Sequence, residues 1–200
     1  MGINLIAEID GFEIYEENFH KRGPGAPPGS TLDGSVEDGC ISEGTHRVLR
    51  FNLHCKNIGN KPLEIGDPAS RPDIFEPSTV HRSGYIMKDK FNMYTLKNDH
   101  GVKVEGFKRP FCLESGAPFT CQNQGIAPHA VDHYTSDLAC QFIVIDNLPD
   151  GDYVLEATTN ATSVLAAKGK GNKILFEEDN YDDNTVSVKL NIQGDNVNRI

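Results

Sequence analysis

Short stretches of alternating apolar and polar residues set the strongest limit on the fold of this chain. Residues 47–55 alternate cleanly, and the Asn-Ile-Gly-Asn sequence at 57–60 is typical of a turn. The same period of two recurs at residues 3–19 and 184–192. Since successive side chains of a strand point to opposite faces, each stretch predicts a strand with one buried face. Helix signals are nearly absent, so the sequence predicts an all-β fold, specifically a twisted β-sandwich.

Other segments add strands that are separated by long irregular loops. Further strands are predicted at residues 86–96, 102–107, 141–145, 153–158 and 174–176, the first two as a hairpin. Segment 20–45 is rich in Gly, Pro, Ser and Asp, and segment 62–77 carries four prolines, so both are predicted to be loops. No internal repeat is visible, and a length of 200 residues suits one domain covering residues 1–200.

The composition argues against several classes of partner. Lys and Arg total 19 while Asp and Glu total 29, which gives a net charge of −10. A protein that binds nucleic-acid phosphates needs a basic face, so no nucleic-acid partner is expected. No apolar run approaches the roughly 18 residues that span a bilayer. The acidic balance suits solubility, cationic partners or calcium.

Two segments carry the most informative motifs. Residues 106–114 read Gly-Phe-Lys-Arg-Pro-Phe-Cys-Leu-Glu, and residues 131–134 read Val-Asp-His-Tyr. Cys-Gln-Asn-Gln-Gly-Ile follows the first motif at 121–126, and Asp-Asn-Tyr-Asp-Asp-Asn lies at 179–184. In this order and spacing they resemble the lysyl oxidase family, the copper and quinone amine oxidases that oxidise protein lysines. The resemblance covers most of the chain and implies the β-sandwich of that family.

The resemblance also implies a cofactor and exposes a departure from the family pattern. In the family a lysine and a tyrosine fuse into lysine tyrosylquinone, and the matching residues here are Lys108 and Tyr134. A His-x-His-x-His copper motif should lie shortly before the Phe-x-x-Tyr-x-Leu match at 91–96. Residues 80–87 contain one histidine, His81, and one imidazole cannot hold Cu(II). The expectation is therefore that copper is lost and that Lys108 and Tyr134 stay unmodified.

The cysteines are expected to be structural. Five cysteines leave at least one unpaired within the chain. Cys112 and Cys121 flank a short loop with Gly and Pro, where a bridge is plausible. Animal members of the family have a cysteine at the position of Ala130, so the resemblance implies that Cys140 has lost that partner here.

His129 and His133 are a second candidate site. Their His-x-x-x-His spacing puts both rings on one side of a helical turn. If His81 lies nearby, as in the family fold, the three histidines could form a relocated transition-metal site. His133, next to Tyr134, could alternatively act as a general base, or both could be surface histidines. His54 is interpreted as an ordinary strand-face residue.

A third candidate site is rich in oxygen ligands of the kind that calcium binds. In animal relatives a cluster here, joined by an N-terminal aspartate, holds a structural calcium. The matching residues, which suggest calcium against the alternative of a solvated acidic turn, are Asn4, Glu178, Asn180, Asp183 and Asn184.

Three functions remain open from the sequence. The first is a divergent family member without copper or quinone that acts as a binding or structural module. The second is an enzyme of another chemistry built on Lys108, His129, His133 and Tyr134. The third is an amine oxidase with a relocated copper site, in which Asp132 orients or abstracts a proton. Basic proteins or small amines are the partners that such sites would suit.

The compartment is expected from the resemblance, which implies a secreted or periplasmic protein. The first residues show no basic region followed by an apolar one, so no signal peptide is predicted within this chain. A cytoplasmic location therefore also stays open from the sequence.

Overall fold

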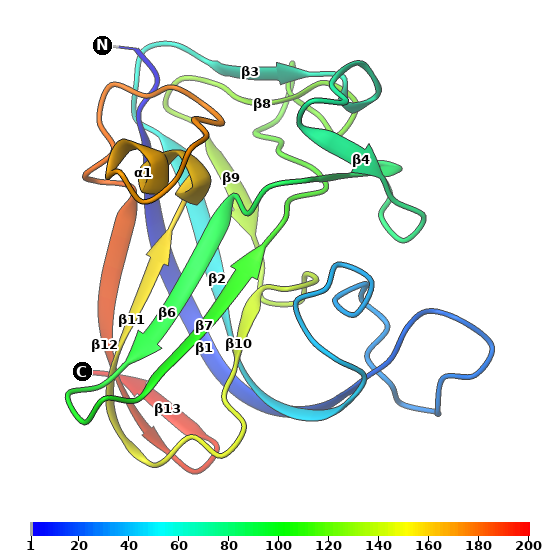
Figure 1. Cartoon of the computed structure of the whole chain (residues 1–200), viewed down its shortest axis with the longest axis vertical. Coiled ribbons are helices and arrows are strands. Elements are labelled where there is room, and N and C mark those ends of the chain that lie inside the picture. The colour runs from blue at the N-terminus through cyan, green and yellow to red at the C-terminus, as the bar shows by residue number, and fades with distance from the viewer. Residues whose placement is uncertain (1) are drawn as a thin grey trace.

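The computed structural model describes residues 2–200 and consists of two large antiparallel sheets and two small ones (Figure 1). In the first large sheet, β2 (Gly44–Asn57) pairs with β1 (Leu5–Phe19), β9 (Val131–Tyr134) and β10 (Phe142–Val144). The second has the order β13 (Asn196–Arg199), β12 (Thr185–Gln193), β11 (Gly151–Thr158), β6 (Asn92–Lys97), β7 (Lys103–Lys108). The small sheets pair β3 (Leu63–Gly66) with β8 (Gln124–Ile126), and β4 (Phe75–Pro77) with β5 (Tyr85–Met87).

The main hydrophobic core lies between the two large sheets. Along β2, the side chains of Leu49, Phe51 and Leu53 are completely buried, as the alternating pattern predicts. Phe51 meets Tyr94 of β6 edge to face, with ring centroids 4.9 Å apart. Contacts of this kind between facing sheets are those of a β-sandwich. The predicted all-β fold is therefore confirmed.

Several predicted elements differ from the structure. Segment 62–77 is not all loop, because it forms β3 and β4 and one turn of 3₁₀-helix at Pro68–Ser70. These strands have three or four residues, too few for an alternating pattern to be visible. No strand forms at 174–176. A helix, α1 (Ala161–Ala167), forms where none was predicted, and it buries Ala161, Ser163 and Val164 against the rest of the structure.

Two disulfides tie loops to the sandwich. Cys112–Cys121 forms as the spacing suggested. Cys140, whose family partner is replaced by Ala130, bonds instead to Cys40, 100 residues earlier. This second bridge attaches the end of the long 20–45 loop to the segment before β10. Cys55 is free and completely buried in the core.

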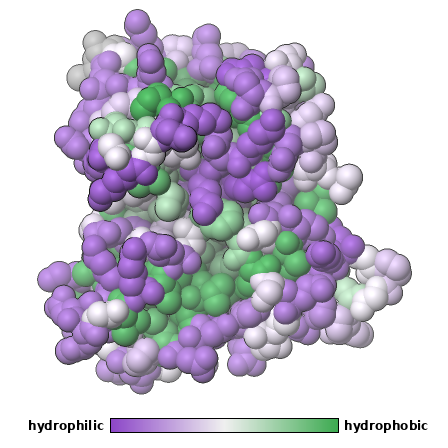
Figure 2. Space-filling model, viewed as in Figure 1, coloured by the Kyte–Doolittle hydropathy of each residue, from purple (hydrophilic) through white to green (hydrophobic). Residues whose placement is uncertain are grey.

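The surface on one side of the sandwich is hollowed. Figure 2 shows that hydrophilic residues cover most of this face, while hydrophobic residues gather in a hollow in its lower half. In the same view, Figure 1 places β7 and β10 in that area. Among residues 2–200, no helix is both long and apolar enough to span a membrane.

Candidate functional site

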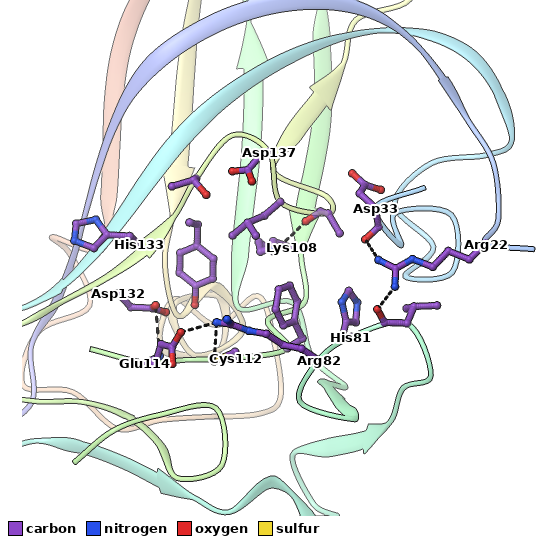
Figure 3. Close-up of a pocket in the computed structure, with 16 residues that line it drawn as sticks. Arg22, Asp33, His81, Arg82, Lys108, Cys112, Glu114, Asp132, His133 and Asp137 are labelled. Atoms are coloured by element: carbon purple, nitrogen blue, oxygen red, sulfur yellow. Dashed lines mark hydrogen bonds and ion pairs between the residues drawn. The ribbon is translucent and has the colours of Figure 1, made fainter. Parts of the chain in front are cut away.

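A cavity of about 820 Å³ lies where β7 and β9 approach the 20–45 loop (Figure 3). Several ionisable side chains line it, namely Arg22, Asp33, His81, Arg82, Lys108, Glu114, Asp132 and Asp137. The loop contributes Arg22 and Asp33, and the Arg22 guanidinium donates to the carbonyl oxygens of Leu32 and Val80. The long loop is therefore a wall of the cavity.

Lys108 ends β7 and points into this cavity. Its side chain is only 1% exposed, and Nζ donates a hydrogen bond to the carbonyl oxygen of Ala139. A Cβ atom on Gly106 would lie 2.8 Å from the Phe142 carbonyl oxygen, so glycine at this position lets β7 lie close to β10. Burial lowers the pKa of Lys108 to about 8, although Asp38 and other nearby carboxylates act in the opposite direction.

Asp132 and Tyr134 face the same cavity from β9. Alternation along this strand directs both side chains inward, where they are 3% and 2% exposed. Neither the Tyr134 hydroxyl nor Asp132 Oδ2 has a hydrogen-bond partner. Burial raises the pKa of Asp132 to about 7, and burial together with the Asp132 charge raises the pKa of Tyr134 well above 10.0. Lys108 Nζ is 5.8 Å from the centroid of the Tyr134 ring, so the structure brings the two predicted quinone precursors together.

His81 also lines the cavity, but its Nε2 already has a hydrogen-bond partner and its ring is stacked. His81 Nε2 lies 2.8 Å from Asp38 Oδ1 and 2.9 Å from Asp38 Oδ2. The imidazole stacks on Phe111 with ring centroids 4.3 Å apart. One imidazole whose Nε2 is held by a carboxylate does not fit the three-histidine copper site of the family pattern.

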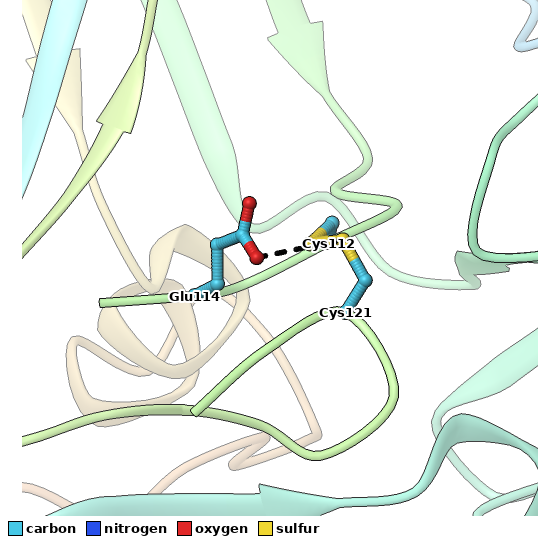
Figure 4. Close-up of side chains that lie close together, drawn as sticks. All are labelled: Cys112, Glu114 and Cys121. Carbon is cyan, nitrogen blue, oxygen red and sulfur yellow. Dashed lines mark hydrogen bonds between the residues drawn. A yellow bond between two sulfur atoms is a disulfide. The ribbon is translucent and has the colours of Figure 1, made fainter. Parts of the chain in front are cut away.

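The other predicted histidines lie apart from His81. His129 is exposed in the turn before β9, and only His133 lines the cavity. Because β9 is a strand, the helical spacing proposed for this pair does not apply. Within residues 2–200, one group of three His, Cys, Asp or Glu ligand atoms is close enough for a metal, at Cys112, Glu114 and Cys121 (Figure 4). Its two sulfur atoms are bonded to each other, so they are not thiolate ligands.

Sequence reasoning missed three residues that shape these sites. Asp38 holds His81, and Glu114 reaches the cavity beside the disulfide. His54 of β2 is not an isolated strand-face residue, because its Nδ1 lies 2.8 Å from His133 Nδ1. No local pattern points to the Asp38–His81 and His54–His133 contacts, since these partners are 43 and 79 residues apart.

The oxygen-rich cluster gathers around Glu178. The Glu178 carboxylate accepts hydrogen bonds from the Leu5 backbone, Asn160 and Asn184, while Asn4 Nδ2 donates to Asp183 Oδ2 at 3.0 Å. Burial raises the pKa of Glu178 to about 6. Four buried oxygens of this cluster have no donor, namely Asn4 Oδ1, Asn160 Oδ1, Asp183 Oδ1 and Asn184 Oδ1.

These unpaired oxygens fit a hard cation such as calcium, which prefers carboxylate and amide oxygen ligands. Asn180, which the sequence predicted as a ligand, makes a local hydrogen bond. It is exposed, and its side-chain oxygen accepts a hydrogen bond from the Asp182 backbone. Asn160 occupies the cluster instead, and nothing in its sequence context indicated that role.

Comparison with known proteins places the chain in a family. Residues 30–191 match the model of the lysyl oxidase family. The chain is 29% identical to lysyl oxidase homolog 2 of Gallus gallus over 84% of its length and 23% of that protein. It is 30% identical to lysyl oxidase homolog 4 of Mus musculus, covering 78% of this chain and 23% of the relative. For protein-lysine 6-oxidase of Gallus gallus the identity is 27%, over 70% of this chain and 38% of the relative.

The chain thus spans about a quarter of lysyl oxidase homologs 2 and 4. The family match covers both β7 and β9, which carry Lys108 and Tyr134. It also covers the segment where the copper motif is reduced to His81. With the β-sandwich, the paired quinone precursors and this match together, the chain belongs to the lysyl oxidase family.

Proposed function

We propose that the cavity is a repurposed site, in which the Lys108 amine binds small carbonyl compounds without the copper-derived quinone of the family. The observation that carries this proposal is the buried Lys108 amine with a pKa of about 8. At neutral pH such an amine is neutral far more often than an ordinary lysine with a pKa of 10.5. A neutral, desolvated lysine is the nucleophile of Schiff-base chemistry.

The neighbouring residues suit the steps of that reaction. Lys108 Nζ adds to the carbonyl carbon to give a carbinolamine, and loss of the hydroxyl group as water leaves a C=N bond. Asp132, whose pKa is about 7, can supply the proton for the departing hydroxyl group and take it back on hydrolysis. Tyr134 stays protonated, so its free hydroxyl can donate a hydrogen bond to the substrate oxygen.

Reductive trapping tests this function. The protein is incubated with propanal and cyanoborohydride, and the labelled lysines are identified by peptide mapping. Lys108 should be alkylated faster than Lys103, an exposed lysine at the start of the same strand. The matched variants are Lys108→Arg and Lys103→Arg, of which only the first should abolish the fast labelling. Equal labelling of Lys103 and Lys108 would contradict the proposal.

A copper-dependent amine oxidase is the second candidate. It is supported by the separation of 5.8 Å between Lys108 Nζ and the Tyr134 ring centroid, because the two precursors are already neighbours. The surroundings of His81 argue against this function, because one imidazole whose Nε2 is held by Asp38 does not fit the copper site of the family. Peptide mapping after exposure to copper and air separates the two functions. A cross-linked Lys108–Tyr134 peptide favours the oxidase, and two unmodified peptides favour the repurposed site.

The oxygen cluster around Glu178 supports a structural calcium site. Asn4, Asn160, Asp183 and Asn184 would supply the ligand oxygens that lack donors. Such an ion would join the start of β1 to the segment before β12, and its charge would favour ionised Glu178.

The two disulfides fit a secreted protein, because such bonds persist in oxidising compartments. The net charge of −10 would favour basic proteins or small amines as partners.

A further inference from the structure

The solvent face of β9 carries a group of polar side chains that the Lys108 chemistry does not use. His133 of β9 lies directly opposite His54 of β2 in the antiparallel register. Their Nδ1 atoms are 2.8 Å apart, and the rings meet edge to face with centroids 4.9 Å apart. His133 is exposed, and the His54 side chain keeps 20% of its surface accessible. The histidine pair therefore lies at the protein surface.

Asp10 of β1 holds His54 from its other side. His54 Nε2 lies 3.2 Å from Asp10 Oδ2, while Asn52 Nδ2 donates to Asp10 Oδ1 at 2.8 Å. A carboxylate oxygen at Nε2 favours the tautomer of His54 with its proton on that nitrogen, which leaves the Nδ1 lone pair free to bind a metal.

The backbone of β1 is shaped for this contact. The register between β1 and β2 shifts between Asp10 and Glu13, which is a β-bulge. Gly11 within the bulge has φ +65°, and a Cβ atom there would lie 2.4 Å from Asn52 Nδ2. Bulges re-aim side chains at functional places in sheets. Here the bulge lets Asn52 and Asp10 approach each other beside His54.

We propose that His54 and His133 bind a divalent first-row transition-metal ion such as Cu²⁺ or Ni²⁺, with water in the remaining positions and Asp10 as the outer partner of His54. With metal–nitrogen bonds of about 2.0–2.1 Å, the observed nitrogen separation of 2.8 Å gives an N–metal–N angle of roughly 85–90°. Right angles suit the square-planar or octahedral sites of Cu²⁺ and Ni²⁺. Tetrahedral zinc would require the nitrogens to move apart to about 3.4 Å.

This ion would not be the quinone-forming copper of the family. Along β9 the side chains of Asp132 and Tyr134 point inward and are buried, whereas His133 is exposed. In Figure 3 the His133 ring points away from Lys108. The metal site therefore joins β1, β2 and β9 on the outer face of the sheet, where His133 also borders the cavity. It does not use the Lys108 amine.

Calorimetric titration of the untagged protein with Ni²⁺ tests the site, with Cu²⁺ electron paramagnetic resonance as a second readout. The wild type should bind one Ni²⁺ at this site, more tightly than Zn²⁺, and its Cu²⁺ spectrum should show two coordinating nitrogens. His54→Ala and His133→Ala should each remove this binding. Asp10→Asn should weaken it by about 10- to 100-fold, as is usual when the partner of a metal-binding histidine is lost.

His129→Asn is the matched control, because it removes an exposed histidine with φ +61° and asparagine tolerates that backbone conformation. It should bind Ni²⁺ as the wild type does. Unchanged Ni²⁺ affinity in both His54→Ala and His133→Ala would overturn the proposal, as would a Cu²⁺ spectrum that His133→Ala leaves unaltered. Lys108 trapping by propanal should persist in His54→Ala, so failure of one proposal is distinguishable from failure of the other.

Discussion

His81 and Asp38 form a buried pair, in which the imidazole Nε2 lies 2.8 and 2.9 Å from the two carboxylate oxygens. Their side chains are only 3% and 4% exposed. His81 is the histidine that remains in the segment matching the copper motif of the family, yet its Nε2 is held by Asp38. The pair therefore places His81 in the wall of the cavity and fixes the 20–45 loop against the turn at residues 80–84.

Removal of this pairing should be costly. Asp38→Ala leaves the buried His81 Nε2 without its hydrogen-bond partner, and an unsatisfied buried polar group costs about 1–3 kcal/mol. Urea unfolding measures the free energy of unfolding. Asp73→Ala is the control, because it removes an exposed carboxylate that pairs with Arg71 and should cost about 0.2–1 kcal/mol. An equal effect of the two substitutions would show that the His81–Asp38 pair does not stabilise the fold.

The labelling of Lys108 should depend on pH with a midpoint near 8. The pKa of this amine is lowered from 10.5 to about 8 by burial, so its reactive neutral form grows between about pH 7 and 9. Reductive trapping with propanal over this range, followed by peptide mapping, measures the midpoint. The control is acetylation of the unfolded protein, in which the Lys108 and Lys103 amines should react at the same rate. A midpoint for Lys108 near 10.5 in the folded protein would contradict the lowered pKa.

Asp132 should make the protein less stable as the pH rises. Its pKa is raised from 3.8 to about 7 by burial, so between these values the folded state binds a proton that the unfolded state has lost. The resulting stability is complete below pH 3.8 and disappears as the pH passes 7. Relative to the wild type, Asp132→Asn should gain about 2–3 kcal/mol between pH 5 and 8. Urea unfolding of both proteins at pH 5 and pH 8 checks this. The prediction is refuted if the difference in unfolding free energy between the two proteins is the same at both pH values.

Calcium should stabilise the protein through the Glu178 cluster. A ligand present at 100 times its Kd stabilises the folded state by about 2.7 kcal/mol, so excess Ca²⁺ should raise Tm and chelation with EGTA should lower it. Asp183→Asn removes a charged ligand whose Oδ1 lacks a donor and should abolish the response. Asp182→Asn changes the exposed neighbour and should keep it. Identical Ca²⁺ responses in the two variants would place the ion elsewhere.

The local order of residues was enough to predict the longer strands, and the resemblance of its motifs to a family marked the pair at the centre of the cavity. Alternation along residues 47–55 reflects which side chains of β2 enter the core, and this depends on neighbouring residues alone. The motifs at 106–114 and 131–134 likewise marked Lys108, Asp132 and Tyr134. Each of them lies on a strand, or at the end of one, that the structure directs into one cavity.

The remaining features depended on the tertiary structure, because they join residues far apart in the sequence. Cys40 meets Cys140 across 100 residues, and His54 meets His133 only because β2 and β9 pair in one register. Asp38 reaches His81 because of the path that the long loop takes. The sequence by itself therefore determined an all-β lysyl oxidase chain with its two quinone precursors. The tertiary structure decided which side chains surround them, since strand register and loop path are set by the packing of the whole chain.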